Sequence, residues 1–113
     1  MRSGPFLAAA LSALALLRDP IAGAADDSRL LRYGAHLARE CTACHRLDGT
    51  ENGIPSILGW DAERFAATLR FYQTGERTNP VMVSIARSLD EEQVKALAAY
   101  YASLPKPAPK AKK

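Results

Sequence analysis

The chain has 113 residues, of which 48% are hydrophobic, and its formal net charge is +3. A chain of this length can fill one modest core, which excludes a second globular domain. Four of the positive charges are lysines in the last eight residues, so the positive excess is confined to a short tail. A nucleic-acid-binding protein carries basic residues across its folded surface, and this distribution therefore argues against a nucleic-acid partner.

The first 24 residues have the pattern of an export signal. Arg2 gives a short basic start, and an almost unbroken apolar run extends from Phe6 to Leu17. Ala22-Gly23-Ala24 then supplies the small residues that a signal peptidase of the A-x-A type requires. We predict that residues 1–24 are removed on export to the periplasm, leaving no stable membrane insertion. The alternative is an uncleaved membrane anchor, for which the apolar run is short and is interrupted by Arg18.

The next two predicted elements are helices. Apolar residues recur at helical spacing over Ser28–Glu40, and Asp26 or Asp27 can cap the start of this helix. The second helix begins after Asp61, a good N-cap, and ends at Gly75. The loop that separates the two helices is rich in glycine and contains a proline, which excludes a long helix or a paired strand there.

The remaining segments predict one further helix between two irregular regions. Residues 76–87 form a connection with at most one helical turn, and Ser88-Leu89-Asp90-Glu91 then fits a capping box that starts the last helix. Pro105 ends that helix, and residues 105–113 alternate proline with lysine and should be extended. We predict an all-α domain over residues 25–104, with three main helices and long loops. Loops of this length need something to fill the space between them.

The chemistry-bearing motif is Cys41-Thr42-Ala43-Cys44-His45, which contains both cysteines of the chain. C-x-x-C-H is the signature for covalent attachment of a c-type haem. Each thiol adds to one vinyl group of the porphyrin, and the short loop brings the next imidazole under the iron. We predict one covalent haem c, attached through Cys41 and Cys44 and ligated by His45, and it would also fill the core.

Three other interpretations of the two cysteines compete with haem. A thioredoxin-like redox pair would sit beside a βαβ pattern, which the sequence lacks. A zinc site would have to combine His36 with the motif, but Cys44 and His45 are sequence neighbours and chelate one tetrahedral ion poorly. A disulfide across so short a loop would add little stability.

Met82 is the candidate for the second axial ligand. It is the only methionine left after removal of the leader, and it follows Asn79-Pro80 in a segment expected to be a loop. His/Met ligation is the arrangement that raises the potential of cytochromes c. The alternative is a methionine that fills a gap in the core. His36, the other histidine, lies on the leading helix and is predicted to be a surface residue.

Residues around the haem can also be proposed from the sequence. A metal-bound imidazole usually donates its other N–H to a carbonyl or carboxylate, and Ile54-Pro55 is a candidate source of that carbonyl. Four residues are candidates to meet the haem propionates, although as a group they more often belong to ordinary core and surface. They are Trp60, Arg70, Tyr72 and Arg77.

With these motifs in place, residues 28–104 resemble a class I c-type cytochrome. The resemblance implies that the first and last helices cross near a glycine, that His and Met ligate the haem, and that a proline carbonyl supports the His. By position it assigns Gly34 and Leu37 to the leading-helix contact, and Leu97 and Tyr101 to the closing helix. It assigns the supporting proline to Pro55 and the haem motif to Cys41, Cys44, His45 and Met82.

Within that class, residues 53–57, 65–77 and 82–87 look most like the cytochrome subunit of flavocytochrome c sulfide dehydrogenase. The resemblance implies a periplasmic electron-transfer subunit that is not itself an enzyme and whose redox partner is a flavoprotein. Two alternatives stay open. One is a free monohaem carrier that serves another oxidoreductase or an oxidase. The other is a haem enzyme or sensor whose sixth iron position is open.

Overall fold

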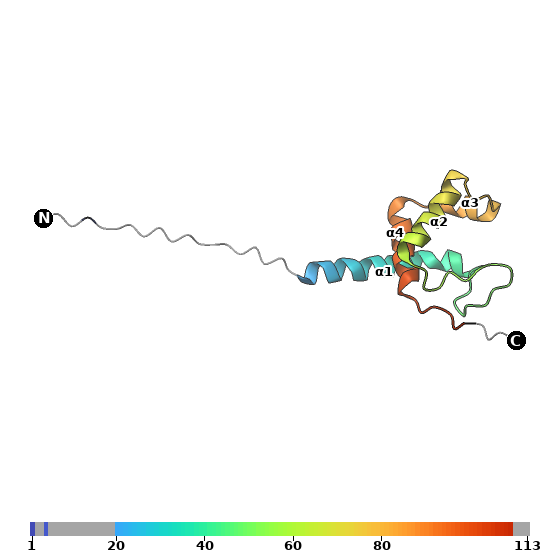
Figure 1. Ribbon diagram of the computed structural model, residues 1–113, viewed down its shortest axis with the longest axis horizontal. Coiled ribbons are helices and arrows are strands. Elements are labelled where there is room, and N and C mark those ends of the chain that lie inside the picture. The colour runs from blue at the N-terminus through green and yellow to red at the C-terminus, as the bar shows by residue number, and fades with distance from the viewer. Residues whose placement is uncertain (2–3, 5–19, 110–113) are drawn as a thin grey trace.

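The computed structural model describes residues 20–109, together with residues 1 and 4. Over this part of the chain it contains helices and no strand, which confirms the all-α prediction (Figure 1). The helices are α1 (Pro20–Thr42), α2 (Ala62–Thr74), α3 (Pro80–Arg87) and α4 (Glu91–Ser103). Most of the predicted export signal lies outside the described residues. None of the described helices is long and apolar enough to cross a membrane.

Helix α1 starts earlier than predicted. It begins at Pro20 and runs through both expected capping residues, Asp26 and Asp27, and through the predicted cleavage site after Ala24. Proline is well suited to the first helical position, and the alanines at 22, 24 and 25 have the highest helix propensity, which offsets the poor propensity of Gly23. Residues 21–29 are exposed, and Figure 1 shows this part of α1 extending away from the other helices.

Helices α1 and α4 pack against each other at Gly34. A Cβ atom at this position would collide with the carbonyl oxygen of Ala96 and would lie 2.6 Å from Cβ of Tyr100. The predicted crossing at a glycine is therefore confirmed. The nearest α4 atoms, however, belong to residues one position before Leu97 and Tyr101. Those two side chains are 1% and 0% exposed and belong to the core.

The core lies where α2 crosses α4. The rings of Phe65 and Tyr101 stack with their centroids 5.2 Å apart and their planes at 16°. The cluster is built from residues of the 43–61 loop and of all four helices. Its buried members are Ala38, Ile57, Leu58, Phe65, Leu69, Ala86, Val94, Leu97, Ala98 and Tyr101.

Helix α2 has the ends that the sequence predicts. The carboxylate of Asp61 accepts a hydrogen bond from the backbone N–H of Arg64, which caps the N-terminus. Gly75 ends the helix with φ of 83°, a left-handed conformation that a glycine adopts without strain.

The segment before α4 differs from the prediction in two ways. Residues 80–87, expected to be a connection with one turn at most, form the two-turn helix α3, so Met82 is helical. The capping box of α4 consists of Asp90 and Gln93 rather than Ser88 and Glu91. The Ser88 hydroxyl instead donates to the carbonyl oxygen of Ile85 at the end of α3. Ser88 is therefore the C-cap of α3, and the N-cap of α4 is Asp90.

The segment after α4 lies against the loop between α1 and α2. A Cβ atom at Gly49 would lie 2.9 Å from Cβ of Pro107, and one at Gly59 would lie 2.9 Å from the carbonyl oxygen of Leu104. Both glycines have positive φ, 75° and 65° respectively. Residues 105–109 have no regular secondary structure, as expected. Lys106 and Pro107 nevertheless lie against the loop that follows His45.

Candidate functional site

One cavity of about 350 Å³ brings the four predicted site residues together. Cys41 comes from the last turn of α1, Cys44 and His45 from the following loop, and Met82 from α3. Leu97 of α4 and apolar residues of the loop and of α2 complete the lining, which includes Ile57, Phe65 and Leu69. A cavity with apolar walls and a few convergent polar groups is the usual form of a cofactor site.

The cysteine motif continues the end of α1 as a tight turn. The carbonyl oxygen of Cys41 accepts hydrogen bonds from the backbone N–H of Cys44 at 3.2 Å and of His45 at 2.8 Å. The turn therefore fixes the spacing between the two thiols and the imidazole. Cys41 is half-buried and Cys44 is exposed, and neither forms a disulfide.

The environment of Cys41 does not favour a redox-active thiolate. Burial raises the pKa of its thiol above the ordinary value, and the nearby hydroxyl of Tyr101 only partly opposes this rise. That hydroxyl is itself buried and has no partner at hydrogen-bonding geometry. The reactive cysteine of a thioredoxin-like pair has a lowered pKa, so the observed direction disfavours that interpretation of the motif.

The tautomer of His45 follows from one hydrogen bond. Its Nδ1 lies 2.7 Å from the carbonyl oxygen of Pro55. A carbonyl can only accept, so Nδ1 carries the proton and Nε2 keeps a free lone pair. The predicted role of Pro55 as the source of the supporting carbonyl is confirmed. His36 is exposed on α1 and does not line the cavity, in agreement with the prediction that it is a surface residue.

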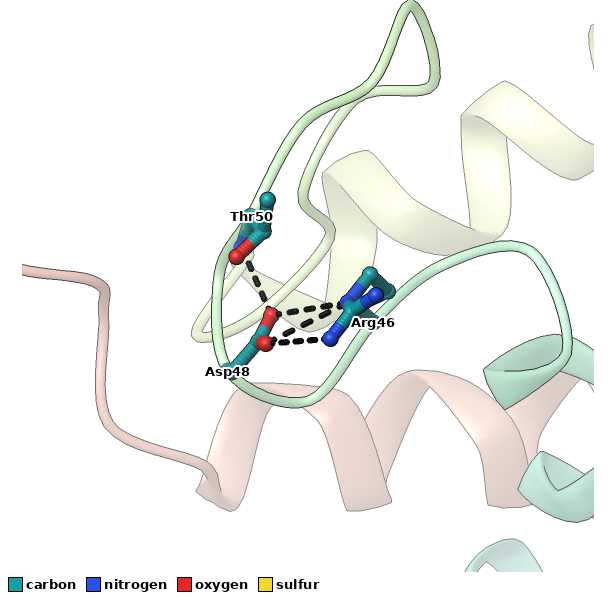
Figure 2. Close-up of polar contacts among 3 residues, drawn as sticks. All are labelled: Arg46, Asp48 and Thr50. Carbon is teal, nitrogen blue, oxygen red and sulfur yellow. Dashed lines mark hydrogen bonds and ion pairs between the residues drawn. The ribbon is translucent and has the colours of Figure 1, made fainter.

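Two carboxylates, Asp48 and Glu51, accept hydrogen bonds from other groups within the loop that carries Pro55. Figure 2 shows Asp48 held by the Arg46 guanidinium, with Nη2 2.8 Å from Oδ2, and by the backbone N–H of Thr50 at 2.9 Å. These bonds hold the pKa of Asp48 far below its usual range. Glu51 then accepts a hydrogen bond from the backbone N–H of Ser56 at 3.1 Å. The sequence analysis missed both carboxylates, although Asp48-Gly49-Thr50 carries the local signal of an Asx turn.

Met82 is held at the start of α3 by the cap of that helix. The Asn79 side-chain oxygen accepts from the backbone N–H groups of Val81 and Met82, both at 3.1 Å. The Met82 side chain is half-buried and lines the cavity. A short, capped helix places the residue more firmly than the loop that was expected there.

Three of the four residues considered for the propionates line the cavity. They are Trp60, Tyr72 and Arg77, whereas Arg70 is exposed on α2 and does not. The Arg77 guanidinium lies 5.7 Å from the centre of the Tyr72 ring, a cation–π distance. Within the described residues, Arg77 is the only arginine that lines this cavity.

The zinc interpretation has no support in the described part of the chain. No group of three or more His, Cys, Asp or Glu side chains there is arranged to hold a metal ion. The exposed position of His36 explains this, because the cysteine motif then lacks a fourth ligand.

Comparison with known proteins gives relatives of one kind. No protein-family model matches the chain. It is 41% identical over 78 residues to a thiosulfate dehydrogenase electron acceptor of Thiomonas intermedia, which covers 64% of this chain and 36% of the relative. It is 34% identical over 98 residues to a protein of the same name from Stutzerimonas stutzeri, which covers 82% of this chain and 45% of the relative. The chain thus spans less than half the length of these two relatives.

A shorter relative matches over most of its own length. The chain is 31% identical over 70 residues to cytochrome c-554(548) of Halomonas halodenitrificans, a match that covers 56% of this chain and 82% of the relative. The chain belongs to the c-type cytochromes. The cofactor of this family is haem c. The relatives support the predicted resemblance to c-type cytochromes, and none of those named here is a sulfide dehydrogenase subunit.

The site of this cytochrome fits such a group in three respects. The two thiols stand at the C-x-x-C-H spacing that covalent attachment requires. His45 has a free Nε2, because Nδ1 donates to Pro55. Met82 brings a soft thioether to the same apolar cavity from a different helix.

Proposed function

We propose that this cytochrome carries single electrons between proteins of the periplasm through one covalently bound haem c. The observation that carries the proposal is the His45–Pro55 hydrogen bond, which leaves Nε2 as a ligand in a cavity shared with Cys41, Cys44 and Met82. The haem supplies a one-electron iron couple at this site. Residues 1–24 are assigned to the export signal and residues 25–104 to the cytochrome domain.

The chain's own residues divide the work of holding the cofactor. Cys41 and Cys44 would hold the haem through two thioether links, and His45 and Met82 would hold its iron. A thioether from Met82 would keep small molecules off the iron, which favours electron transfer over catalysis there. An enzyme or sensor with an open sixth position is the competing function, and rapid binding of carbon monoxide to the reduced protein at neutral pH would favour it.

The rim of the cavity supports docking of a redox partner. Ile54, Val81 and Ile85 line the cavity and are also 37%, 63% and 37% exposed. Apolar side chains beside a cofactor site are the kind of surface that a transient redox partner covers. Electrons can then pass over a short distance without any substrate reaching the cavity.

The donor is proposed to be an oxidoreductase of an inorganic sulfur compound. Two relatives bear the name thiosulfate dehydrogenase electron acceptor, and this favours a thiosulfate dehydrogenase. Joining two thiosulfate ions into tetrathionate releases two electrons, so two oxidised molecules of the cytochrome are reduced per tetrathionate formed. The second candidate donor is a flavoprotein sulfide dehydrogenase, which the sequence resemblance over residues 53–87 favours.

The proposal is tested with the haem-loaded cytochrome and each donor in turn. The rate of haem reduction is measured with a thiosulfate dehydrogenase and thiosulfate, and with a flavoprotein sulfide dehydrogenase and sulfide. Horse heart cytochrome c is the control acceptor. We expect the first donor to reduce this cytochrome faster than the control, and raised salt will show how much the contact depends on charge. Equal rates for both acceptors with both donors would contradict a sulfur-oxidising role.

A further inference from the structure

Helix α3, which carries Met82, is attached to the rest of the domain through α2. Among the described helices, α2 is the one whose backbone lies beside that of α3, and Ala86 adds a side-chain contact with the core. The N-terminal cap of α3 is Asn79, the residue directly before the helix, so this cap does not join α3 to another helix. The position of Met82 therefore depends on what joins α2 to α3.

That junction contains a set of hydrogen bonds centred on Gln73, near the end of α2. The Gln73 side-chain Nε2 donates to the carbonyl oxygen of Ala86 at 2.9 Å and to that of Leu89 at 3.2 Å. In return, the Arg87 Nε donates to the Gln73 backbone carbonyl at 3.2 Å. One residue of α2 is thus bonded to two residues at the end of α3, Ala86 and Arg87, and to Leu89 in the connection to α4.

The chemistry of these acceptors makes Gln73 hard to replace. The Ala86 carbonyl accepts from the backbone N–H of Leu89 at 3.2 Å. The half-buried Gln73 amide adds a second donor to this carbonyl and one to the Leu89 carbonyl, where α3 ends and the chain turns into α4. Ala86, one turn after Met82, is 0% exposed, so this end of α3 is pressed into the core. Met82 and Ala86 are four residues apart and lie on one face of the helix.

We propose that Gln73 is a positioning residue for Met82: it holds α3 on α2 and thereby keeps the Met82 thioether in the cavity. The inference rests on the proposed function, in which Met82 is the sixth ligand of the haem iron. When the Gln73 donors are removed, the end of α3 separates more readily from α2, and the thioether leaves the cavity more often. The cysteine motif and His45 are held by other contacts and are not affected.

The test compares variants of the haem-loaded protein by the rate at which imidazole binds to the oxidised form. Binding requires the sixth position to open, so this rate reports departure of the ligand. Gln73→Leu removes both side-chain hydrogen bonds that join α2 to the end of α3, and we expect imidazole to bind about tenfold faster, the effect of losing roughly one to two hydrogen bonds. Thr74→Val is the matched control, because the Thr74 hydroxyl bonds only to Phe71 within α2, and its rate should equal that of the wild type.

Two polar variants decide the question even if Gln73→Leu does not fold. Gln73→Lys keeps a donor of similar reach, and a positive charge is favourable at the end of a helix, so it should bind imidazole at close to the wild-type rate. Gln73→Glu places a carboxylate against two carbonyl oxygens and should bind faster. Equal rates for the Lys and Glu variants would overturn the role of Gln73.

A parallel measurement separates failure of this inference from failure of the ligand assignment. Met82→Ala should bind imidazole at once and should lack the far-red sulfur-to-iron absorption band. If that band persists in Met82→Ala, Met82 is not the ligand and both proposals fall. If Met82→Ala behaves as expected while Gln73→Leu matches Thr74→Val, only the role of Gln73 is overturned.

Discussion

The imidazole of His45 and the carbonyl of Pro55 are joined by a hydrogen bond of 2.7 Å that spans ten positions of sequence. The carbonyl makes the imidazole more basic, because it draws the Nδ1 proton toward itself. A more basic ligand stabilises the oxidised iron. With His45 as the proposed iron ligand, the geometry of the intervening loop would help to set the reduction potential.

Loosening that loop should raise the potential. Asp48→Ala removes the acceptor of Arg46 and of the Thr50 N–H, which frees the loop that carries Pro55. We expect a weaker bond to His45, and hence a higher potential by redox titration, with the spectrum of the haem otherwise unchanged. Asp27→Ala, which removes one exposed carboxylate from α1, controls for the change of charge. A potential that shifts equally in both variants would show that only charge matters.

The Asp48 contact should also survive mild acid. The pKa of Asp48 is lowered in the folded protein, so its stabilising contribution is complete above the unfolded-state pKa and is lost only as the pH falls toward the folded value. We therefore expect Asp48→Ala and the wild type to differ in potential by the same amount at pH 7 and at about pH 3. A carboxylate with the ordinary pKa of about 3.9 would be mostly protonated at about pH 3, and convergence of the two potentials there would contradict the lowered pKa.

Met82→Ala should open the sixth position without releasing the haem. We expect loss of the far-red absorption band, a markedly lower potential, and binding of carbon monoxide to the reduced protein. The haem should stay attached through Cys41 and Cys44, which denaturing gel electrophoresis with haem staining checks. If His36→Ala rather than Met82→Ala produced these changes, the assignment of the axial ligand would be wrong.

Gly34→Ala should destabilise the domain although alanine favours helices. The new methyl group would collide with the Ala96 carbonyl and with Tyr100, so α1 and α4 must separate. Overpacking of this kind costs about 1–3 kcal/mol. The replacement of glycine by alanine gains ~1 kcal/mol in helix propensity, which does not offset the cost of a clash with backbone atoms. Denaturant unfolding of the haem-loaded protein measures the difference, with His36→Ala as a surface control on the same helix. An unchanged midpoint would argue against the close crossing.

Two truncations should separate the parts of the C-terminal segment. Removal of residues 105–113 takes away Pro107, which contacts Gly49, and should lower the melting temperature, by about 4–8 °C if 1 kcal/mol is lost. Removal of residues 108–113 leaves that contact in place and should not change the melting temperature. Calorimetry of both proteins checks this. If the two truncations melt alike, the contact with the loop contributes nothing to stability.

The export prediction is tested by mass. Periplasmic protein should have the mass of residues 25–113 plus one haem, and acid-acetone should not extract the haem. A mass that includes residues 1–24 would favour the uncleaved anchor. In that case α1 would keep the segment from Pro20 to Ala24 that the structure shows as helix.

Much of the fold could be predicted because the signals are local. The caps at Asp61 and Gly75 bound α2 through contacts with residues a few positions away, and both are present as expected. The motif from Cys41 to His45 is a covalent signature that depends on spacing alone. Pro55 was identified for a different reason, because the resemblance to class I cytochromes assigns the supporting proline to this position.

Other features were decided by the tertiary structure. Met82 was expected in a connection, but residues 80–87 are helical, and the far end of that helix is bonded to Gln73 across thirteen positions of sequence. Likewise, Pro107 lies beside Gly49, which belongs to the loop between α1 and α2 and is far from Pro107 in the sequence. Such contacts depend on how helices pack rather than on neighbouring residues. The sequence by itself determined the cytochrome family and the candidate residues for its chemistry. Packing decided how those residues are held, because a hydrogen bond between distant segments forms only once the core has brought them together.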